Sequence, residues 1–99
     1  LVHTTLVATS NGKIAGFADM DESGYLDHLY VHQQHQRQGI ATILCDVLET
    51  ETPAAVLSVH ASITAKDFFL RRGYQLLHAQ QVERQGQHLT NFRMEKRKT

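Results

Sequence analysis

Gln36-Arg37-Gln38-Gly39-Ile40-Ala41 joins an extended apolar segment to a strongly amphipathic one, and the other elements can be placed around it. A glycine at the point where a strand turns into a helix lets backbone N–H groups approach an anion closely. The first turn of the helix adds the positive end of the helix dipole. This junction therefore predicts a site for a pyrophosphate group.

The residues after the junction follow a helical period. Their apolar positions recur at i, i+3, i+4, i+7 and i+8, which places them on one face of a helix. They are Ile40, Ile43, Leu44, Val47 and Leu48. Pro53 ends this helix, and residues 54–59 form a short apolar run that predicts a strand. A strand, a helix and a second strand indicate a βαβ unit with parallel outer strands.

The residues before the junction predict an antiparallel run of strands over residues 1–9, 14–20 and 25–31. Asn11-Gly12 is a strong hairpin signal between the first two strands. After the βαβ unit we expect a helix over residues 62–72 and a closing hairpin. The predicted order β-β-β-α-β-α-β-β is α+β, similar to an α/β sandwich, with a mixed and mostly antiparallel sheet.

Composition limits the classes of protein to consider. The chain has 99 residues, which is one small domain or a piece of one, and its hydrophobic share of 41% suffices for a single core. Ten Lys and Arg balance ten Asp and Glu, which argues against a nucleic-acid binder. No apolar run approaches the roughly 20 residues that cross a bilayer. The single Cys45 fits a buried thiol in a reducing cytoplasm.

Two blocks of sequence together resemble a known family. The first is Leu29-Tyr30-Val31, followed by Gln36-x-x-Gly39-x-Ala41 and the amphipathic helix. The second is His60-Ala61-Ser62, followed by Ala65, Phe68-Phe69 and Arg72-Gly73-Tyr74. In this order they resemble the acetyl-CoA-binding motif and the next block of the GCN5-related N-acetyltransferases. The resemblance implies a single domain over residues 1–99 of this fold, without the family's first strand and following helices.

The resemblance also implies a reaction, the direct transfer of an acetyl group from acetyl-CoA to a small-molecule or peptide amine. The junction would hold the pyrophosphate of the cosubstrate, and the pantetheine arm would lie along the strands on either side of the first helix. The Leu29 N–H would stabilise the oxyanion. The cofactor-binding residues expected on this basis are Leu29, Tyr30, Val31, Gln36, Arg37, Gln38, Gly39, Ile40, Ala41, Thr42, His60 and Phe69.

An alkylamine has a pKa of about 10, so the acceptor needs a base. Asp27 is a candidate because the strand alternation puts it on the same face as Leu29 and Val31, and Glu22 at the neighbouring strand end is the second candidate. His60 is a third catalytic candidate, next to pantetheine or the leaving thiolate. Phe69 stands where many family members have a proton-donating tyrosine, and it cannot donate a proton.

Other functions remain open at this point. His28, His32 and His35 are close in sequence, but their spacing on a strand and a loop does not bring three ligands together, so no metal site is expected. The alternative to an enzyme is a non-catalytic acyl-CoA-binding module, or a partial domain completed by a second chain at the edge of residues 1–10. A homodimer is compatible with the sequence, and no nucleic-acid or membrane partner is expected.

Overall fold

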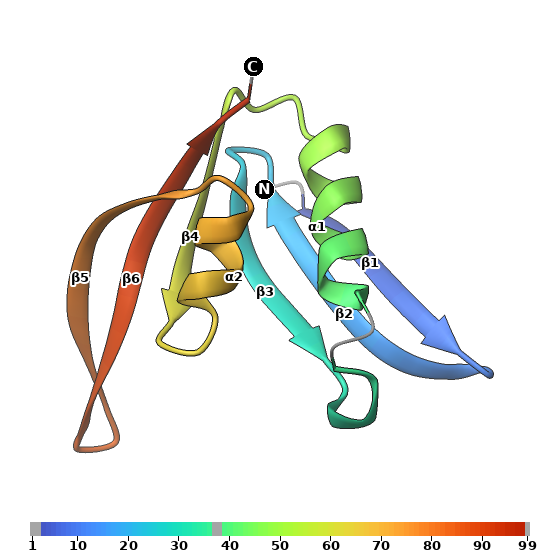
Figure 1. Cartoon of the computed structure of the whole chain (residues 1–99), viewed down its shortest axis with the longest axis horizontal. Helices are drawn as coiled ribbons and strands as arrows, with labels where there is room; N and C mark the ends of the chain where they lie inside the picture. The colour runs from blue at the N-terminus through green and yellow to red at the C-terminus, as the bar shows by residue number, and fades with distance from the viewer. Residues whose placement is uncertain (1–2, 37–38, 99) are drawn as a thin grey trace. The chain divides into compact units, whose positions relative to one another are not determined.

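The structure is a computed structural model that describes residues 3–36 and 39–98. Its elements follow the predicted order of strands and helices (Figure 1). They are β1 (His3–Ser10), β2 (Lys13–Asp21), β3 (Tyr25–Val31), the 3₁₀ helix η1 (Gln33–His35), α1 (Ile40–Glu51), β4 (Val56–Ser62), α2 (Lys66–Arg71), β5 (Gln75–Arg84) and β6 (Gln87–Arg97). The chain divides into two compact units, Leu1–Ala54 and Ala55–Thr99.

The first unit is an antiparallel sheet in the order β1-β2-β3, with α1 packed against one face (Figure 1). The predicted hairpin between β1 and β2 is confirmed. Asn11 has φ 53° and Gly12 has φ 79°. Positive φ at both central residues is the signature of the tight turn that matches the twist of antiparallel strands.

The core of the first unit lies between α1 and the sheet. Small and medium apolar side chains of β2 and β3 meet Leu44 and Leu48 of α1, which are 3% and 1% exposed. The buried residues here are Ala15, Ala18, Met20, Leu26, Leu44, Cys45 and Leu48. The predicted helix face was partly wrong, because Ile43 is 61% exposed and Val47 is 39% exposed. The buried stripe is rotated toward Cys45, which is 2% exposed.

Gly16 of β2 lies where the backbone of β3 comes very close. A Cβ at this position would stand 2.7 Å from the Tyr30 carbonyl oxygen and 3.2 Å from Ile40 Cγ2. A backbone carbonyl in a sheet cannot move aside cheaply, so we expect Gly16→Ala to lower the free energy of unfolding by about 1–3 kcal/mol. Urea denaturation measures this change. Lys13→Ala, at an exposed position of the same strand, should change stability by no more than about 0.5 kcal/mol.

The second unit is an antiparallel sheet in the order β4-β6-β5, and α2 packs against β4. Phe69 of α2 is 2% exposed, and its ring meets the rings of Phe68 and Tyr74 at centroid distances of 5.1 and 5.2 Å. Leu57 and Met94 complete this core from the sheet, both 0% exposed. Tyr74 is therefore a core residue, as expected for the aromatic after the glycine.

Two boundaries in the second unit differ from the prediction. β4 continues to Ser62, and α2 begins only at Lys66. The reason is the turn between them, where the Ala65 N–H donates to Ser62 Oγ at 3.2 Å and to the Ser62 carbonyl. Ser62 thus organises the turn that precedes α2. Gly73, with φ 94°, follows the C-terminus of α2 as predicted.

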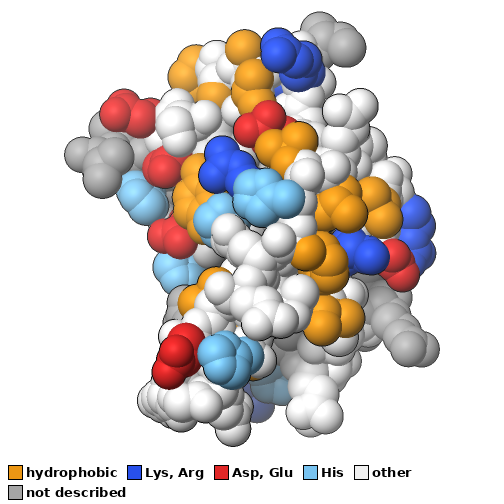
Figure 2. Space-filling view, turned by 90° about the vertical axis from the view of Figure 1, so that its left-hand side faces the viewer, with side chains coloured by type: hydrophobic (Ala, Val, Ile, Leu, Met, Phe, Trp, Pro, Cys, Tyr) orange, Lys and Arg blue, Asp and Glu red, His pale blue; other side chains and the backbone are white. Residues whose placement is uncertain are grey.

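Both units leave apolar side chains at the surface. On β5 and β6, Leu76, Leu77 and Leu89 are 45%, 47% and 49% exposed. Figure 2 shows the side of the molecule on which hydrophobic side chains lie among Lys, Arg and His.

Across the described residues, neither helix combines the length and apolar character needed to cross a membrane.

Candidate functional site

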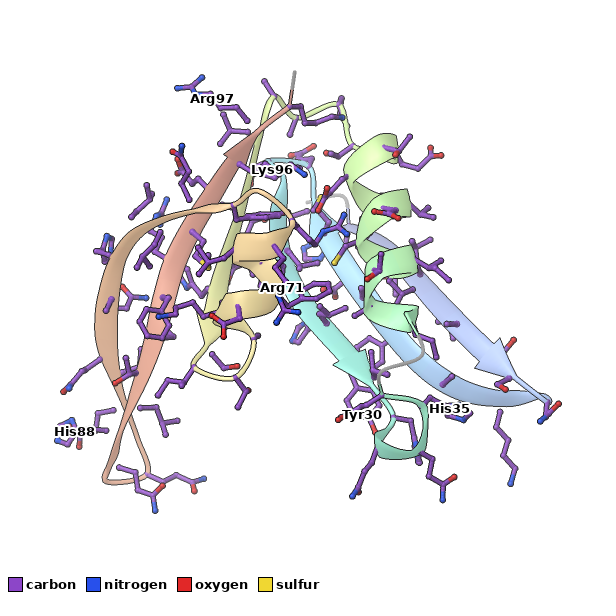
Figure 3. All side chains as sticks on the ribbon, in the orientation of Figure 1. Tyr30, His35, Arg71, His88, Lys96 and Arg97 are labelled. Carbon is purple, nitrogen blue, oxygen red and sulfur yellow. The ribbon has the colours of Figure 1, made fainter. Side chains whose placement is uncertain are left out.

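The segment between β3 and α1 is held by short local hydrogen bonds. The Gln34 N–H donates to His32 Nδ1 at 3.1 Å, which fixes the start of η1. The Gln36 side-chain amide donates to the Val31 carbonyl at 3.4 Å, so its side chain turns back toward the strand. Figure 3 labels Tyr30 at the end of β3 and His35 in η1, on either side of the start of this segment. The predicted contributions of Arg37 and Gln38 lie outside the described residues.

Gly39 starts α1 in the left-handed region, with φ 78°. Its carbonyl accepts the first helical hydrogen bond, from the Ile43 N–H at 3.0 Å. No described side chain caps this helix, and its first turn holds no acidic residue. A Cβ on Gly39 would meet no described atom within 4 Å, so there is open space beside the backbone. The first N–H groups of α1 have no intrahelical acceptor, and they are placed to receive an anion in that space.

The N–H groups of β3 alternate between its two edges. The His28 N–H donates to Asp19 at 2.8 Å, and the His32 N–H donates to the Ala15 carbonyl at 2.7 Å, so both point toward β2. Along an antiparallel strand the direction of the N–H groups alternates from one residue to the next, so the odd-numbered residues here direct theirs away from β2. Leu29 and Val31 therefore present their N–H groups at the edge of β3 that faces away from β2. This is the orientation that the predicted oxyanion role of Leu29 requires.

A β-bulge interrupts this strand next to the candidate base. Asp19 pairs with His28 and Met20 pairs with Leu26, so Asp27 is the extra residue. A bulge puts two consecutive side chains on nearly the same side of a strand. The Asp27 carboxylate accordingly lies 3.6 Å from His28 Nδ1, on the face of the sheet that carries Asp19. The prediction that Asp27 shares a face with Leu29 and Val31 was wrong, because the bulge breaks the alternation.

Asp19 and His28 form a pair that the sequence did not reveal. The two oxygens of Asp19 lie 3.1 and 3.2 Å from His28 Nδ1, and one of them also accepts the His28 N–H. His3 of β1 brings a second imidazole to Asp19 and Asp27. These residues come from different strands, and only the strand register shows that they meet. The sequence offered one sign of this meeting, which is an Asp in each of two strands predicted to pair, Asp19 and Asp27.

Glu22 lies in the turn between β2 and β3, at the opposite end of β3 from the junction. The turn is organised by Asp21, which accepts hydrogen bonds from the Ser23 N–H, the Ser23 hydroxyl and the Tyr25 N–H at 2.9, 2.6 and 3.1 Å. Glu22 is exposed and lines a pocket of about 230 Å³ with residues that end α1, among them Glu51 and Pro53. Glu22 is thus near the C-terminus of α1, while the predicted anion site is at its N-terminus.

The hydrogen bond from the Ser23 hydroxyl, followed by those from backbone N–H groups, lowers the pKa of Asp21. A carboxyl group with a lowered pKa in the folded state stabilises the protein above its unfolded pKa of about 3.9. That stability is lost as the pH falls below about 4. We expect the melting temperature to fall more between pH 6 and pH 2 in the wild type than in Asp21→Asn. If the melting temperatures of the two proteins fell by the same amount over this pH range, this role of Asp21 would be contradicted.

The second unit carries the other two predicted site residues. His60 is exposed on β4, opposite Arg93 of β6. Phe69 lies in the core described above, so its predicted contact with a cofactor stays a prediction. Phe69 is 2% exposed and Tyr74 is 3% exposed, so neither side chain lies at the surface.

Comparison with known proteins gives one family. Residues 2–97 match the model of the acetyltransferase (GNAT) domain. The chain is 40% identical over 89 residues to the uncharacterized N-acetyltransferase YafP of Escherichia coli K12, covering 89% of this chain and 57% of that protein. The chain thus spans a little over half of this curated relative.

Solved structures of N-acetyltransferases have the same fold as this chain. A GCN5-related N-acetyltransferase from Rhodopseudomonas palustris superposes with a TM-score of 0.90 at 36% identity, over 96% of this chain and 61% of that one. A ribosomal-protein-alanine N-acetyltransferase from Brucella melitensis gives a TM-score of 0.80 at 23% identity, over 94% and 67%. They confirm the predicted fold class, which is α+β with a mixed, mostly antiparallel sheet. The chain belongs to the GCN5-related N-acetyltransferase (GNAT) family.

Proposed function

We propose that this chain takes part in the transfer of an acetyl group from acetyl-CoA to an amine. The observation that carries the proposal is the start of α1, where Gly39 precedes a helix without a described side-chain cap, and a Cβ on Gly39 would meet no described atom within 4 Å. The pyrophosphate of coenzyme A is the anion that such a helix start would receive. Two structures of the same fold, at 16% and 18% identity, were solved with coenzyme A and with acetyl-CoA, which supports this choice of anion.

The edge of β3 supports the same cosubstrate. The pantetheine arm carries two amides, and backbone N–H groups of a strand bind amides as they would bind a neighbouring strand. The N–H groups of Leu29 and Val31 point to that edge. We assign the thioester carbonyl to the Leu29 N–H, where the charge that develops on the oxygen during attack would be stabilised.

Asp27 is our candidate for the base. Asp27 stands two residues before Leu29 on β3, and its side chain is 39% exposed on the other face of the strand, so solvent or an amine can reach it. Glu22 is less suited because it lies in the turn near the C-terminus of α1. We propose that Asp27 takes the proton of the acceptor amine, directly or through water.

The thiolate that leaves needs a proton from another group. Phe69 has none to give, and Tyr74 is 3% exposed against the Phe69 ring. Tyr30 is 46% exposed and lies on the strand that carries Leu29. The phenol of Tyr30, His60 or water is therefore the proposed proton source.

Cofactor binding and turnover test the proposal separately. Acetyl-CoA at millimolar concentration should raise the melting temperature, while adenosine at the same concentration should not. Release of free thiol should then exceed the rate in buffer for at least one amine of a panel of polyamines, amino acids and peptides. The assay contains a chelator. If the melting temperature does not move, the cofactor assignment fails. If it moves but every amine is inert, the chain by itself is an acyl-CoA-binding module.

A further inference from the structure

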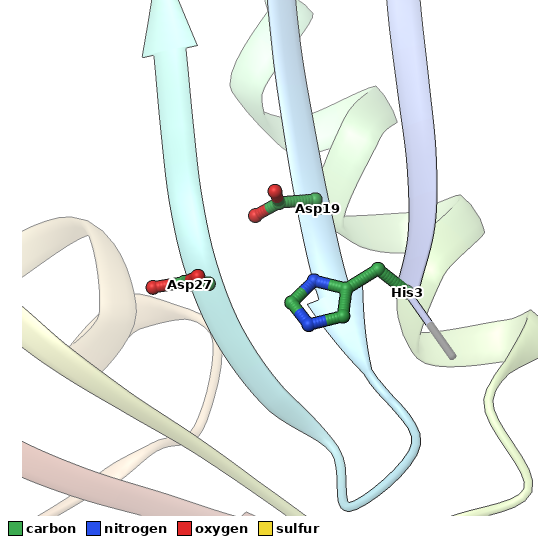
Figure 4. A group of neighbouring side chains, drawn as sticks. All are labelled: His3, Asp19 and Asp27. Carbon is green, nitrogen blue, oxygen red and sulfur yellow. The ribbon is translucent and has the colours of Figure 1, made fainter. Parts of the chain in front are cut away.

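The open face of the first sheet, opposite α1, carries a cluster of metal-ligating side chains (Figure 4). His3 comes from β1, Asp19 from β2 and Asp27 from β3, and one ligand atom of each lies within 4.8 Å of the others. His28 joins them, with Nδ1 at 3.1 Å from Asp19 and 3.6 Å from Asp27. The cluster is defined here as His3, Asp19, Asp27 and His28.

We propose that this cluster binds a divalent transition-metal ion of the Zn²⁺ type. Zinc bonds to imidazole nitrogen and carboxylate oxygen are about 2.0–2.2 Å long, so neighbouring ligand atoms around the ion stand about 3–3.5 Å apart. His28 Nδ1 lies 3.1 Å from Asp19 and 3.6 Å from Asp27 as a hydrogen-bond and ion-pair partner, and separations of this size also suit two ligands of one ion. His3 is exposed at the surface, so its side chain can change rotamer when an ion binds.

The charge and chemistry of the cluster select the class of ion. Two carboxylates and two neutral imidazoles balance a divalent cation. Half of the ligands are nitrogen, which favours Zn²⁺, Co²⁺, Ni²⁺ or Cu²⁺ over the oxygen-seeking Mg²⁺ and Ca²⁺. The side chain of Asp19 is 18% exposed, which holds one ligand in place at the centre of the group.

The β-bulge gives the cluster its shape. Without the extra residue in β3, Asp27 and His28 would point to opposite faces, and the sheet would offer at most two ligands from this strand pair. With the bulge, three adjacent strands converge on one point. An ion held there would link β1, β2 and β3 and stabilise the folded chain. Because the ion would also occupy Asp27, the acetyl-transfer assays above include a chelator.

The test is metal binding by tag-free, chelator-stripped protein, measured by calorimetry with ZnCl₂ and separately with MgCl₂. We expect one Zn²⁺ per chain, a higher melting temperature with Zn²⁺, and no comparable binding of Mg²⁺. His3→Gln and Asp19→Asn should each weaken Zn²⁺ binding at least 10-fold. His3→Gln changes an exposed side chain, so it serves even if Asp19→Asn disturbs the bulge. His88→Gln, at an exposed position of β6, is the control and should bind as the wild type does.

Two results would overturn the inference. One is the absence of saturable Zn²⁺ binding in the wild type. The other is Zn²⁺ binding that both His3→Gln and Asp19→Asn leave unchanged, which would place the ion on other histidines. Neither result depends on acetyl transfer, so the proposed function stands or falls separately.

Discussion

Gly39→Glu should abolish the binding of acetyl-CoA. The substitution places a carboxylate at the start of α1, in the space assigned to the pyrophosphate. Two like charges about 4 Å apart repel each other by about 4 kcal/mol at the effective dielectric near a protein surface. The affinity should therefore fall by at least about 100-fold, which corresponds to about 2.7 kcal/mol. Calorimetric titration with acetyl-CoA measures the loss directly.

The backbone cost of this substitution needs a matched control. Gly39 has φ 78°, and a side chain there is strained whether or not a ligand binds. Gly12→Glu provides the comparison, because Gly12 has φ 79° and equally open surroundings in the hairpin between β1 and β2. We expect Gly12→Glu to lower stability by a similar amount and to bind acetyl-CoA normally. Unchanged affinity in Gly39→Glu would show that the pyrophosphate is not held at this helix.

The local elements could be predicted from the sequence because their signals are local. Asn11-Gly12 requires positive φ at two consecutive residues, and the chain adopts it. Pro53 follows the last residues of α1, and Gly73 follows α2, as their backbone preferences dictate. The junction at Gly39 was predicted because a glycine lets backbone N–H groups approach an anion, and its φ of 78° is a finding of the structure.

The features that the sequence did not predict depend on contacts between elements that are distant along the chain. The apolar period of α1 does not say whether Ile43 or Cys45 faces the sheet, because both flank the Leu44–Leu48 stripe. The bulge at Asp27 arises from the register of β3 against β2, which alternation along one strand cannot show. That bulge changes the candidate site most. It moves Asp27 to the side of Asp19 and brings His3 and His28 to the same place.

Asp27→Asn should reduce the rate of acetyl transfer strongly and leave cofactor binding intact. An amide cannot accept the proton of the acceptor amine, and loss of a positioned base costs about 10²–10⁴-fold in rate. The defect should appear in kcat, while the thermal shift with acetyl-CoA stays that of the wild type, because Asp27 belongs to β3 and not to the start of α1, where the pyrophosphate would bind. Thiol release in the presence of a chelator, followed from pH 6 to pH 10, is the measurement.

Glu22→Gln is the matched control, since it removes the other carboxylate considered as the base. Its position in the turn near the C-terminus of α1 predicts a rate close to that of the wild type. The pH profile adds a second criterion. If Asp27 removes the proton, raising the pH should partly restore the Asn variant, because a growing share of the amine is then already deprotonated. A variant that keeps its full rate at pH 7 would exclude Asp27 as the base. If only Glu22→Gln lost activity, the acceptor amine would have to be placed at the turn between β2 and β3.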